Sequence, residues 1–418
     1  MHISQLNGTI SLATILIYLD RKYCSSRMTK NKEVFGNIIM FIFWLPFFAS
    51  SIDSFIDLTQ LTNKIIQLIW LISFTYVFKL ITQRCNPPII NSGLFFTFFM
   101  MFYGVIHLMF GETLQSFDRL VPKSEYLVGI ISSLLPVFFI YYYSLKGVVT
   151  ENLIRKWSLL FLFTVIIAYF NSVVKMQAMT EADQFTNNIG YVILRSIPFL
   201  LFWYKRPILQ YVLFVLLGIL ILESLKRGPI LIWLILLVIF VYTTYKRIKT
   251  ERALKKILLF ILPVVLLGFA MHYFNNTLIY NEGFMNRFMA TLEGDDSGRG
   301  EIYNSILQVF YFHSGLLQTL FGHGADATIR LFATHAHNDW LEILINQGVA
   351  GVIIYIIYYL SFYRQLKSAK DIFGKTLLLN VLVIIVITSL FSMSYMAYDC
   401  SVHILLGYSI YRASKIFG

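Results

Sequence analysis

The chain of 418 residues is 57% hydrophobic and 17% aromatic, and only 13% of its residues are charged. Soluble proteins carry about 25% charged residues, so this composition, with a mean hydropathy of +0.69, excludes a soluble globular fold. The net charge of +12 is carried mostly by short loops, where basic residues orient membrane proteins. We therefore expect a lipid bilayer, and no nucleic acid, as the partner of this charge.

Apolar runs of about 15–22 residues recur along the chain, the length that a helix needs to cross a bilayer. The alternating pattern of an outer-membrane barrel is absent. The sequence thus predicts an all-α, polytopic helical bundle with about 12–14 transmembrane helices, because helices satisfy their own backbone groups in lipid. The expected spans lie near residues 5–19, 34–51, 65–82, 93–110, 126–146, 157–174, 189–204, 207–223, 230–245, 256–274, 348–363, 375–396 and 401–413.

The loops between these spans alternate in charge. Basic loops lie at Asp20–Glu33, Gln83–Ser92, Lys146–Lys156, Lys205-Arg206, Lys246–Lys256 and Arg364–Lys375. The intervening loops are neutral or mixed, and they lie at Ser51–Asn63, Gly111–Glu125, Lys175–Asn188 and Asn275–Gln347, with a short basic turn at Lys226-Arg227 as the exception. The positive-inside rule places the basic set in the cytoplasm and the neutral set outside.

One external loop is far longer than the others and divides the chain into three parts. We expect a transmembrane bundle over residues 1–274, a long loop over 275–347 and C-terminal transmembrane helices over 348–418. Loops of this length are usually functional or disordered, and the aromatic content of this one favours a folded loop. Within it, Glu301–Phe312 has the spacing of a helix with Ile302, Ile306, Val309 and Phe310 on one face.

Two arginines are expected at the external ends of spans. Arg227 precedes Gly228-Pro229, which begins the next span, and a proline suits the first turn of a helix. Arg227 therefore lies at a helix N-terminus, where free N–H groups favour an anion. Arg195 falls about six residues inside its span, where a charge usually faces a cavity or a partner. The alternative for both is a side chain that extends to the interface.

The long loop adds Arg287, Arg299 and Arg330. Guanidinium groups are planar and bind phosphate through two donors, so these arginines are candidates for a phosphate or diphosphate site. The alternative is a set of solvated loop charges. A metal site formed by the loop carboxylates is a further alternative, but their spacing does not match the calcium-loop pattern. The carboxylates in question are Glu293, Asp295, Asp296 and Glu301. We expect no metal and no cofactor.

A pair of histidines, His335 and His337, precedes the last apolar stretch of the loop. Asn338 is a suitable N-cap for a helix over Asp339–Asn346, which Gly348 would end. The inward side chains of this helix are expected to be Leu341, Leu344 and Ile345.

The dipole of this helix disfavours a protonated imidazole at its N-terminus. A neutral imidazole suits a general base, and His337 is the preferred candidate because it adjoins Asn338. The alternatives are a histidine that only bridges the loop, or a metal site completed by His313 or His323.

Several arginines beside a candidate base at one membrane face predict a lipid-linked phosphate or diphosphate ligand. The arginines would stabilise the leaving group, and the histidine would activate a hydroxyl on an acceptor. A transporter is a different possibility, but few charged residues fall near the midplane, where transport sites lie. A structural membrane protein would not require this set of residues.

The chain resembles the O-antigen polymerase and O-antigen ligase superfamily of bacterial envelopes. The resemblance covers about Pro207–Tyr363 and depends on four features. These are the turn Lys226-Arg227-Gly228, the long external loop, the arginine in Ser297–Glu301, and the His-Asn helix from His335 to Gly348. The last of these is the most specific.

The resemblance implies a membrane glycosyltransferase of the GT-C type in the bacterial inner membrane, metal-independent and inverting, with its long loop in the periplasm. The donor would be an undecaprenyl-diphosphate-linked oligosaccharide. Arg227 and Arg299 would bind the diphosphate, and His337 would be the base or would orient the acceptor, with less support for His335 and Arg195. A chain-length regulator protein is a further partner that it implies.

Polymerase and ligase share this plan and differ in the acceptor. We prefer a polymerase, which moves the growing glycan onto the next lipid-linked unit, because an aromatic-rich loop suits gripping sugars on both substrates. A ligase that moves the glycan to the lipid A core, and a flippase for lipid-linked sugars, are the alternatives.

Overall fold

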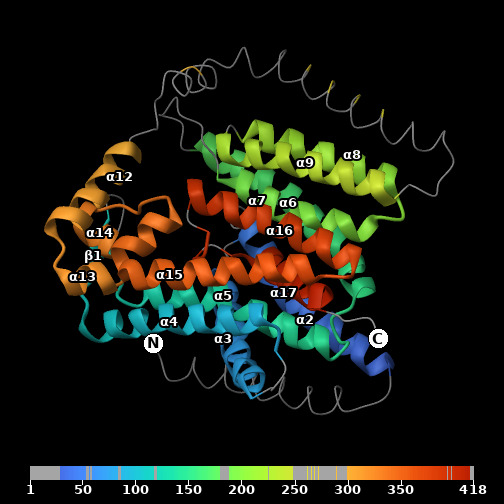
Figure 1. Ribbon diagram of the computed structural model, residues 1–418. Helices are drawn as coiled ribbons and strands as arrows, with labels where there is room; N and C mark the ends of the chain where they lie inside the picture. The colour runs from blue at the N-terminus through green and yellow to red at the C-terminus, as the bar shows by residue number, and fades with distance from the viewer. Residues whose placement is uncertain are drawn as a thin grey trace.

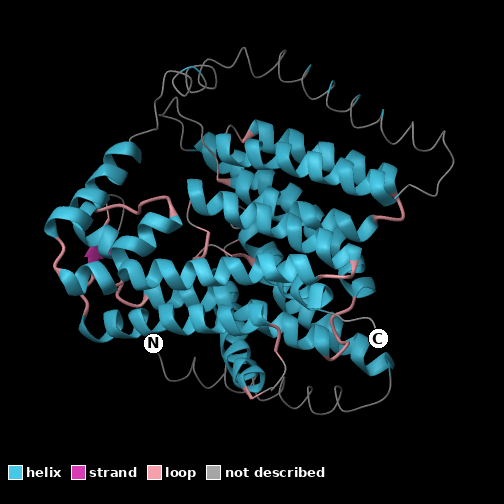
Figure 2. Cartoon of the chain, in the orientation of Figure 1, coloured by secondary structure: helices cyan, strands magenta, loops and turns pink. Residues whose placement is uncertain are grey.

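The computed structural model describes residues 29–52, 56, 59–82, 86–116, 120–178, 188–224, 226–247, 299–392, 394–396 and 398–414, with single positions at 261, 265, 268, 272 and 289. Over these residues the chain is almost entirely helical (Figure 2). Seven of the described helices are long and apolar enough to cross a membrane, and three shorter apolar helices accompany them. The prediction of an all-α polytopic membrane protein is confirmed.

The N-terminal elements are α2 (Thr29–Ser51), α3 (Thr59–Ile81), α4 (Pro88–Phe110), β1 (Leu114–Gln115), β2 (Leu120–Val121), α5 (Glu125–Leu145), α6 (Glu151–Ala178), α7 (Ile189–Ser196), η1 (Ile197–Trp203), α8 (Pro207–Glu223) and α9 (Arg227–Arg247). The C-terminal elements are α12 (Arg299–Gln308), η4 (Val309–His313), α13 (Leu316–Phe321), α14 (Ala327–Phe332), α15 (Asp339–Ser368), α16 (Ile372–Phe391) and α17 (Cys400–Ser414). The two short strands pair as an antiparallel hairpin.

The helix α5 lies at the centre of the bundle, where it packs against α3, α4 and α17. The helix α17 also packs against α16, which packs in turn against α9, and α15 packs against α4 (Figure 1). The core between these helices is aromatic: Phe96 of α4 stacks on Tyr355 and Tyr358 of α15 at centroid distances of 5.2 Å. Such ring pairs add packing energy in a lipid environment that supplies no hydrophobic driving force between helices.

One expected span is divided in the structure. Residues 189–204 form the α-helix α7 and then the 3-10 helix η1, with Pro198 at the start of the second segment. Proline lacks the N–H that would continue the α-helical bonds, so the change of helix type follows from the sequence. The expected spans at 5–19 and 256–274 lie wholly or almost wholly outside the described residues.

One end of the bundle gathers the loops that were predicted to be basic and cytoplasmic. Arg412 near the end of α17 donates to Asp371 at 2.7 Å and to Glu151 at 3.0 Å, which joins α17, α16 and α6. Beside them, Lys156 of α6 pairs with Glu33 of α2 at 2.6 Å. The structure thus places several of these loops on one side of the bundle, as the alternation of charge predicts.

The opposite end is covered by the described part of the long loop, where α12, α13, α14 and the hairpin cluster beside the start of α15 (Figure 1). The predicted apolar face of α12 is confirmed at Ile306, which is fully buried, with Ile302 and Val309 packed around it. The aromatic residues that follow behave differently. Tyr311 and Phe312 remain 70% and 79% exposed, so they do not form the core of this loop.

Candidate functional site

The helix α15 bends at Gly348, which has a left-handed backbone with φ of 66°. A short helix therefore ends there, as predicted, and a transmembrane helix continues from it. The bend frees two carbonyl groups, and the loop after α13 satisfies both: the amide of His323 donates to Ile345 at 2.8 Å, and that of Gly324 to Asn346 at 2.9 Å. The short helix is thereby fixed to the folded loop on one side and to the membrane bundle on the other.

The start of α15 is tied to the segment between α16 and α17. The Asn338 side chain accepts from the amides of Trp340 and Leu341 at 2.9 and 3.2 Å, which confirms it as the N-cap. The next residue, Asp339, is fully buried, and its carboxylate accepts from the Ser394 amide at 2.8 Å and from the Tyr355 hydroxyl at 2.9 Å. A buried carboxylate is stable only when it is hydrogen-bonded, so this contact sets where the helix begins.

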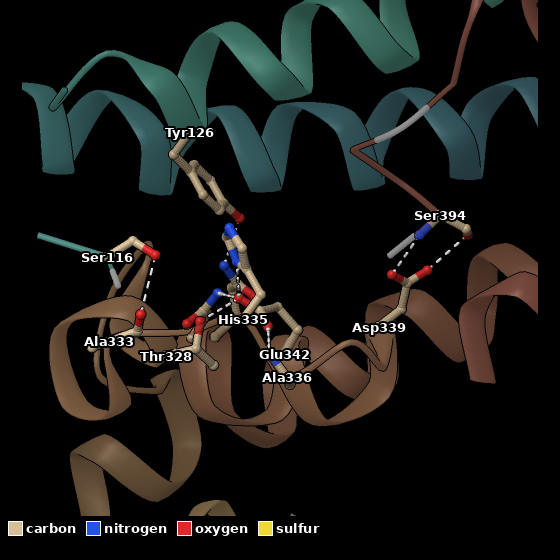
Figure 3. Close-up of polar contacts among 11 residues, drawn as sticks. Ser116, Tyr126, Thr328, Ala333, His335, Ala336, Asp339, Glu342 and Ser394 are labelled. Carbon is tan, nitrogen blue, oxygen red and sulfur yellow. Dashed lines mark hydrogen bonds and ion pairs between the residues drawn. The ribbon is translucent and has the colours of Figure 1, made fainter. Parts of the chain in front are cut away.

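The first turn of α15 carries a second buried carboxylate, Glu342, which is 1% exposed. One of its oxygens accepts from the Ala336 amide at 2.8 Å. The other accepts from the Thr328 hydroxyl of α14 and lies 3.4 Å from both Asn346 Nδ2 and His335 Nδ1. Figure 3 shows Thr328, His335 and Ala336 around Glu342, below the ring of Tyr126 from α5.

The predicted inward face of this short helix is therefore only partly right. Ile345 is buried as expected, but Leu341 and Leu344 are only half-buried. Ile343 and Glu342 are buried instead. The reason is that α15 packs against α12, α13 and α14, and its short helix also contacts Tyr126 of α5 and Ser394. More than one face is therefore covered, and polar side chains complete the interior.

Three non-glycine residues of the described chain have positive φ angles, and all three lie around this cluster: Asp326, Ala333 and His337, at 53°, 56° and 51°. Left-handed backbone at such residues costs of the order of 1–3 kcal/mol and is often found at functional sites. The strain is held in place locally, because the Ser116 hydroxyl donates to the Ala333 carbonyl at 3.1 Å and Glu342 binds the amide of Ala336.

Arg299 begins α12, and its guanidinium donates to the carbonyl of Phe391 at 2.9 Å. The preceding carbonyl, that of Leu390, accepts from Asn338 at 3.1 Å. The last carbonyls of α16 therefore hold Arg299 and the N-cap residue next to each other. The positive charge of Arg299 contributes to lowering the pKa of His337. No carboxylate among the described residues pairs with Arg299, so its positive charge is not neutralised by that part of the chain.

The turn before α9 lies within electrostatic range of the same histidine, because the charge of Lys226 also acts on His337. Arg227 is the first residue of α9, as the sequence predicts. Gly228 lies close to α7: a Cβ atom there would lie 2.5 Å from the Tyr191 hydroxyl. Both Arg299 and Arg195 act on that hydroxyl, so the turn, α7 and the start of α12 meet at one place.

Arg195 pairs with Asp399, the residue just before α17, at 3.7 Å, and the two side chains are only 13% and 20% exposed. The sequence predicts that this charge faces a cavity or a partner, and the structure confirms a partner, Asp399. Asp399 in turn accepts from the Val402 amide at 3.0 Å at the start of α17. Arg195 is therefore held by an ion pair rather than extended toward the interface.

The two histidines differ in their surroundings. His337 lies at the surface, yet neighbouring protein removes part of the water around its ring, and with the charges of Arg299, His335 and Lys226 this lowers its pKa. The predicted neutral imidazole is thus supported, although desolvation and nearby cations contribute rather than the helix dipole alone. Burial also favours a neutral His335, but the hydrogen bond and charge of Glu342 outweigh it and raise the pKa of His335.

Some of the predicted residues lie away from this site, and others fall outside the residues that the structure describes. Arg287, and the carboxylates Glu293, Asp295 and Asp296, fall outside the described residues. Arg330 points elsewhere and donates to the carbonyl of His323. His323 contacts Ser314 at 2.8 Å. Among the described residues no group of three or more His, Cys, Asp or Glu side chains is arranged to hold a metal ion.

Sequence reasoning did not identify the buried acids behind the histidines. Asp326 is 3% exposed, and burial raises its pKa to about 7. Its Oδ2 atom has no hydrogen-bond partner among the described residues. Glu342 lies at the fourth helical position after the N-cap, and a carboxylate there is a common helix-start residue. Nothing in the local sequence indicates its contact with His335.

The fold and this site define a class: a polytopic helical membrane protein with cations and a histidine gathered at one end of its bundle. The comparison with known families gives the particular group. Residues 212–356 match the family model Wzy_C, described as O-antigen ligase, so this part of the chain is similar to that family. The matched segment contains Arg227, Arg299, both histidines and Gly348. No curated protein matches the chain.

Proposed function

We propose that this protein is a glycosyltransferase that moves a glycan from an isoprenyl-diphosphate carrier to a hydroxyl of a second saccharide, at the membrane face where α15 begins. The observation that carries the proposal is the fixing of Arg299 and Asn338 on the last two carbonyls of α16. This arrangement holds a guanidinium beside a histidine of lowered pKa. An anionic leaving group and a hydroxyl nucleophile need these two kinds of group.

In the proposed reaction His337 takes the proton of the acceptor hydroxyl, and the acceptor oxygen attacks the anomeric carbon of the donor sugar. The bond from that carbon to the diphosphate oxygen breaks, and the anomeric configuration inverts. The leaving isoprenyl diphosphate takes the electron pair of that bond. Arg299 and Arg227 stabilise its added charge, and Arg195 supports the same region through its ion pair with Asp399. His337 then releases its proton to solvent.

Cations from the protein can stabilise the leaving group in this scheme without a metal ion. We therefore expect purified enzyme to keep its transfer activity after treatment with a chelator of divalent ions. Loss of activity that added Mg²⁺ restores would instead support a metal site formed by Glu293, Asp295 and Asp296.

The finer proposal is a polymerase, whose acceptor is the next lipid-linked repeat unit in the periplasm. Two exposed aromatic side chains of η4, Tyr311 and Phe312, support it, because exposed rings are suited to stacking on sugars. A ligase, with lipid A core as acceptor, is the second candidate, and the printed description of the matched family favours it.

A deletion strain examined on a lipopolysaccharide gel separates these functions. Loss of the polymerase leaves a single repeat unit on the core. Loss of the ligase leaves polymer on the lipid carrier and none on the core. A flippase would give carrier-linked units trapped on the cytoplasmic side, and that outcome would contradict a transferase.

A further inference from the structure

The four groups that face the Glu342 carboxylate come from three parts of the fold: α14, the loop before α15, and α15 itself. Thr328 Oγ1, the Ala336 amide and Asn346 Nδ2 donate to it, and His335 Nδ1 lies at 3.4 Å. A carboxylate buried to 1% exposure is costly unless it is fully hydrogen-bonded. Four partners fill the acceptor positions of the two oxygens, and one of these partners is the imidazole of His335.

The position of these partners relates Glu342 to His337. His335 and Ala336 are the two residues immediately before His337, and Glu342 binds the side chain of the first and the amide of the second. His337 has a left-handed backbone at φ 51°, which is uncommon for residues other than glycine. On the following side, Asn338 is held by Leu390. The residue is therefore fixed from both directions.

We propose that Glu342 is a positioning residue of the transfer site, which holds His335 through its side chain and, through the amide of Ala336, fixes His337 two residues further along. This inference rests on the proposed function, because it assigns the two histidines opposite charge states in that reaction. His337 accepts the proton of the acceptor hydroxyl. His335 does not exchange a proton during the reaction and supplies a permanent positive charge next to the base.

The charged groups around the pair are consistent with this division. His335 faces the negative charges of Glu342, Asp326 and Glu125, and they raise its pKa although burial lowers it. The cations around His337 are Arg299, His335 itself and Lys226, and with desolvation they lower the pKa of His337 although Glu342 acts in the opposite sense.

The expected dependence of kcat/KM on pH follows from these directions. The neutral form of His337 is lost as pH falls through its lowered pKa, so the acidic limb lies below the ordinary histidine range. The protonated form of His335 is lost as pH rises through its raised pKa, so the alkaline limb lies above that range. A broad bell results, whose two limbs belong to the coupled pair.

Glutamine cannot replace Glu342. A carboxamide has one acceptor oxygen and one NH₂ donor, whereas both oxygens of Glu342 face donors. In Glu342→Gln the charge that holds the proton on His335 is lost. The alkaline limb should move to lower pH. The acidic limb should move little, because the loss of the positive charge on His335 and the loss of the negative charge on Glu342 act on the pKa of His337 in opposite senses. The bell narrows on its alkaline side, and its maximum falls by about 10–100-fold, as when the hydrogen-bond partner of a metal-bound histidine is replaced.

The experiment measures kcat/KM against pH for the purified full-length protein with an undecaprenyl-diphosphate-linked donor and a saccharide acceptor. The variants are Glu342→Gln, His335→Gln and their combination. The matched control is Asp339→Asn, which removes another buried carboxylate from the same helix start. Its partners are Ser394 and Tyr355 rather than a histidine. The control should lower thermal stability but leave both limbs in place.

A narrowed bell in Glu342→Gln, with little further loss in the double variant, supports the proposal, since the two residues then act as one unit. An unchanged bell with a lower maximum means that Glu342 is only structural and overturns it, as does an equal shift in Asp339→Asn. If the wild-type protein itself transfers no glycan, the proposed function fails, and this result is distinct from a failure of the Glu342 assignment.

Discussion

Two arginines at opposite ends of the bundle show how the same residue type serves different purposes. Arg412 is enclosed by two carboxylates, Asp371 and Glu151, and its side chain is 19% exposed. Arg299 is held by one backbone carbonyl, that of Phe391, and no carboxylate of the described residues pairs with it. The first arginine has its charge satisfied within the protein, whereas the second has no such partner among the described residues, which suits the anionic ligand that we propose.

The same contrast extends to the backbone. At the Arg412 end the helices meet through ion pairs between their ends. At the Arg299 end, three residues with a strained backbone surround a buried carboxylate. There the end of α13 also packs closely against α15, with Gly322 next to Gly348. An arrangement that stores strain is maintained by its surroundings. We therefore expect substitutions at the Arg412 end to change mainly stability and substitutions at the Arg299 end to change mainly glycan transfer.

The largest effect is expected for His337→Ala in a strain that depends on this protein. Removal of a general base costs about 10²–10⁴-fold in rate, so long-chain glycan should disappear while the protein remains in the membrane. The matched control is His313→Ala, which changes an exposed histidine of η4 in the same loop. Normal glycan ladders in the His337 variant would show that this residue is not the base.

A somewhat smaller loss is expected for Arg227→Lys. A lysine keeps the charge but cannot bind phosphate oxygens through two parallel N–H groups, so transfer should fall by about 10²–10³-fold, comparable to loss of one leaving-group donor. The comparison is Arg330→Lys in the same assay, since Arg330 donates only to a backbone carbonyl. Full activity of Arg227→Lys would mean that the residue serves only to anchor its helix.

Gly348→Ala should damage the site through the backbone. The left-handed conformation alone costs about 1–3 kcal/mol, and the new Cβ would lie 2.5 Å from the Gly322 amide nitrogen. We expect a lower thermal midpoint together with loss of transfer. Gly324→Ala is the matched control. Its φ is 98°, so alanine is strained there as well, but no atom lies within 4 Å of the new Cβ. Equal losses of stability and transfer in the two variants would show that the close contact between Gly348 and Gly322 is not the cause.

The smallest functional effect is expected at the other end. Arg412→Ala leaves Asp371 and Glu151 without their shared partner and should lower stability by about 1–3 kcal/mol. Transfer per folded molecule should not change. Lys156→Ala breaks an ion pair that is 54% exposed on both sides, and solvent screens such a pair, so it should lower stability less than Arg412→Ala does. Thermal midpoints of the purified proteins test both expectations.

The sequence predicts much of the fold because lipid leaves few choices. Apolar length and loop charge identify the spans, and the structure places Glu33, Lys156, Glu151 and Arg412 at one end as the charges predict. The site was predicted where a single local pattern carries it. Asn338 is the N-cap, and Gly348 ends the short helix, because both depend on residues within one turn.

The remaining features arise from contacts between distant residues. Glu342 meets Thr328 from α14, and Arg299 meets the end of α16, 92 residues away. Neither contact has a local signal in the sequence. The same is true of the short hairpin, whose Leu114 and Val121 pack on Ile329. The exposure of Tyr311 and Phe312 also depends on what packs beside them, which composition does not specify.

The central claim is that transfer chemistry belongs to the end of the bundle where α15 begins. The most direct test is glycan transfer by purified His337→Ala beside purified Arg412→Ala, each normalised to the amount of folded protein. We predict that His337→Ala loses transfer by at least about 10²-fold and that Arg412→Ala retains the wild-type rate. Equal losses in the two variants, or wild-type transfer by His337→Ala, would contradict the claim.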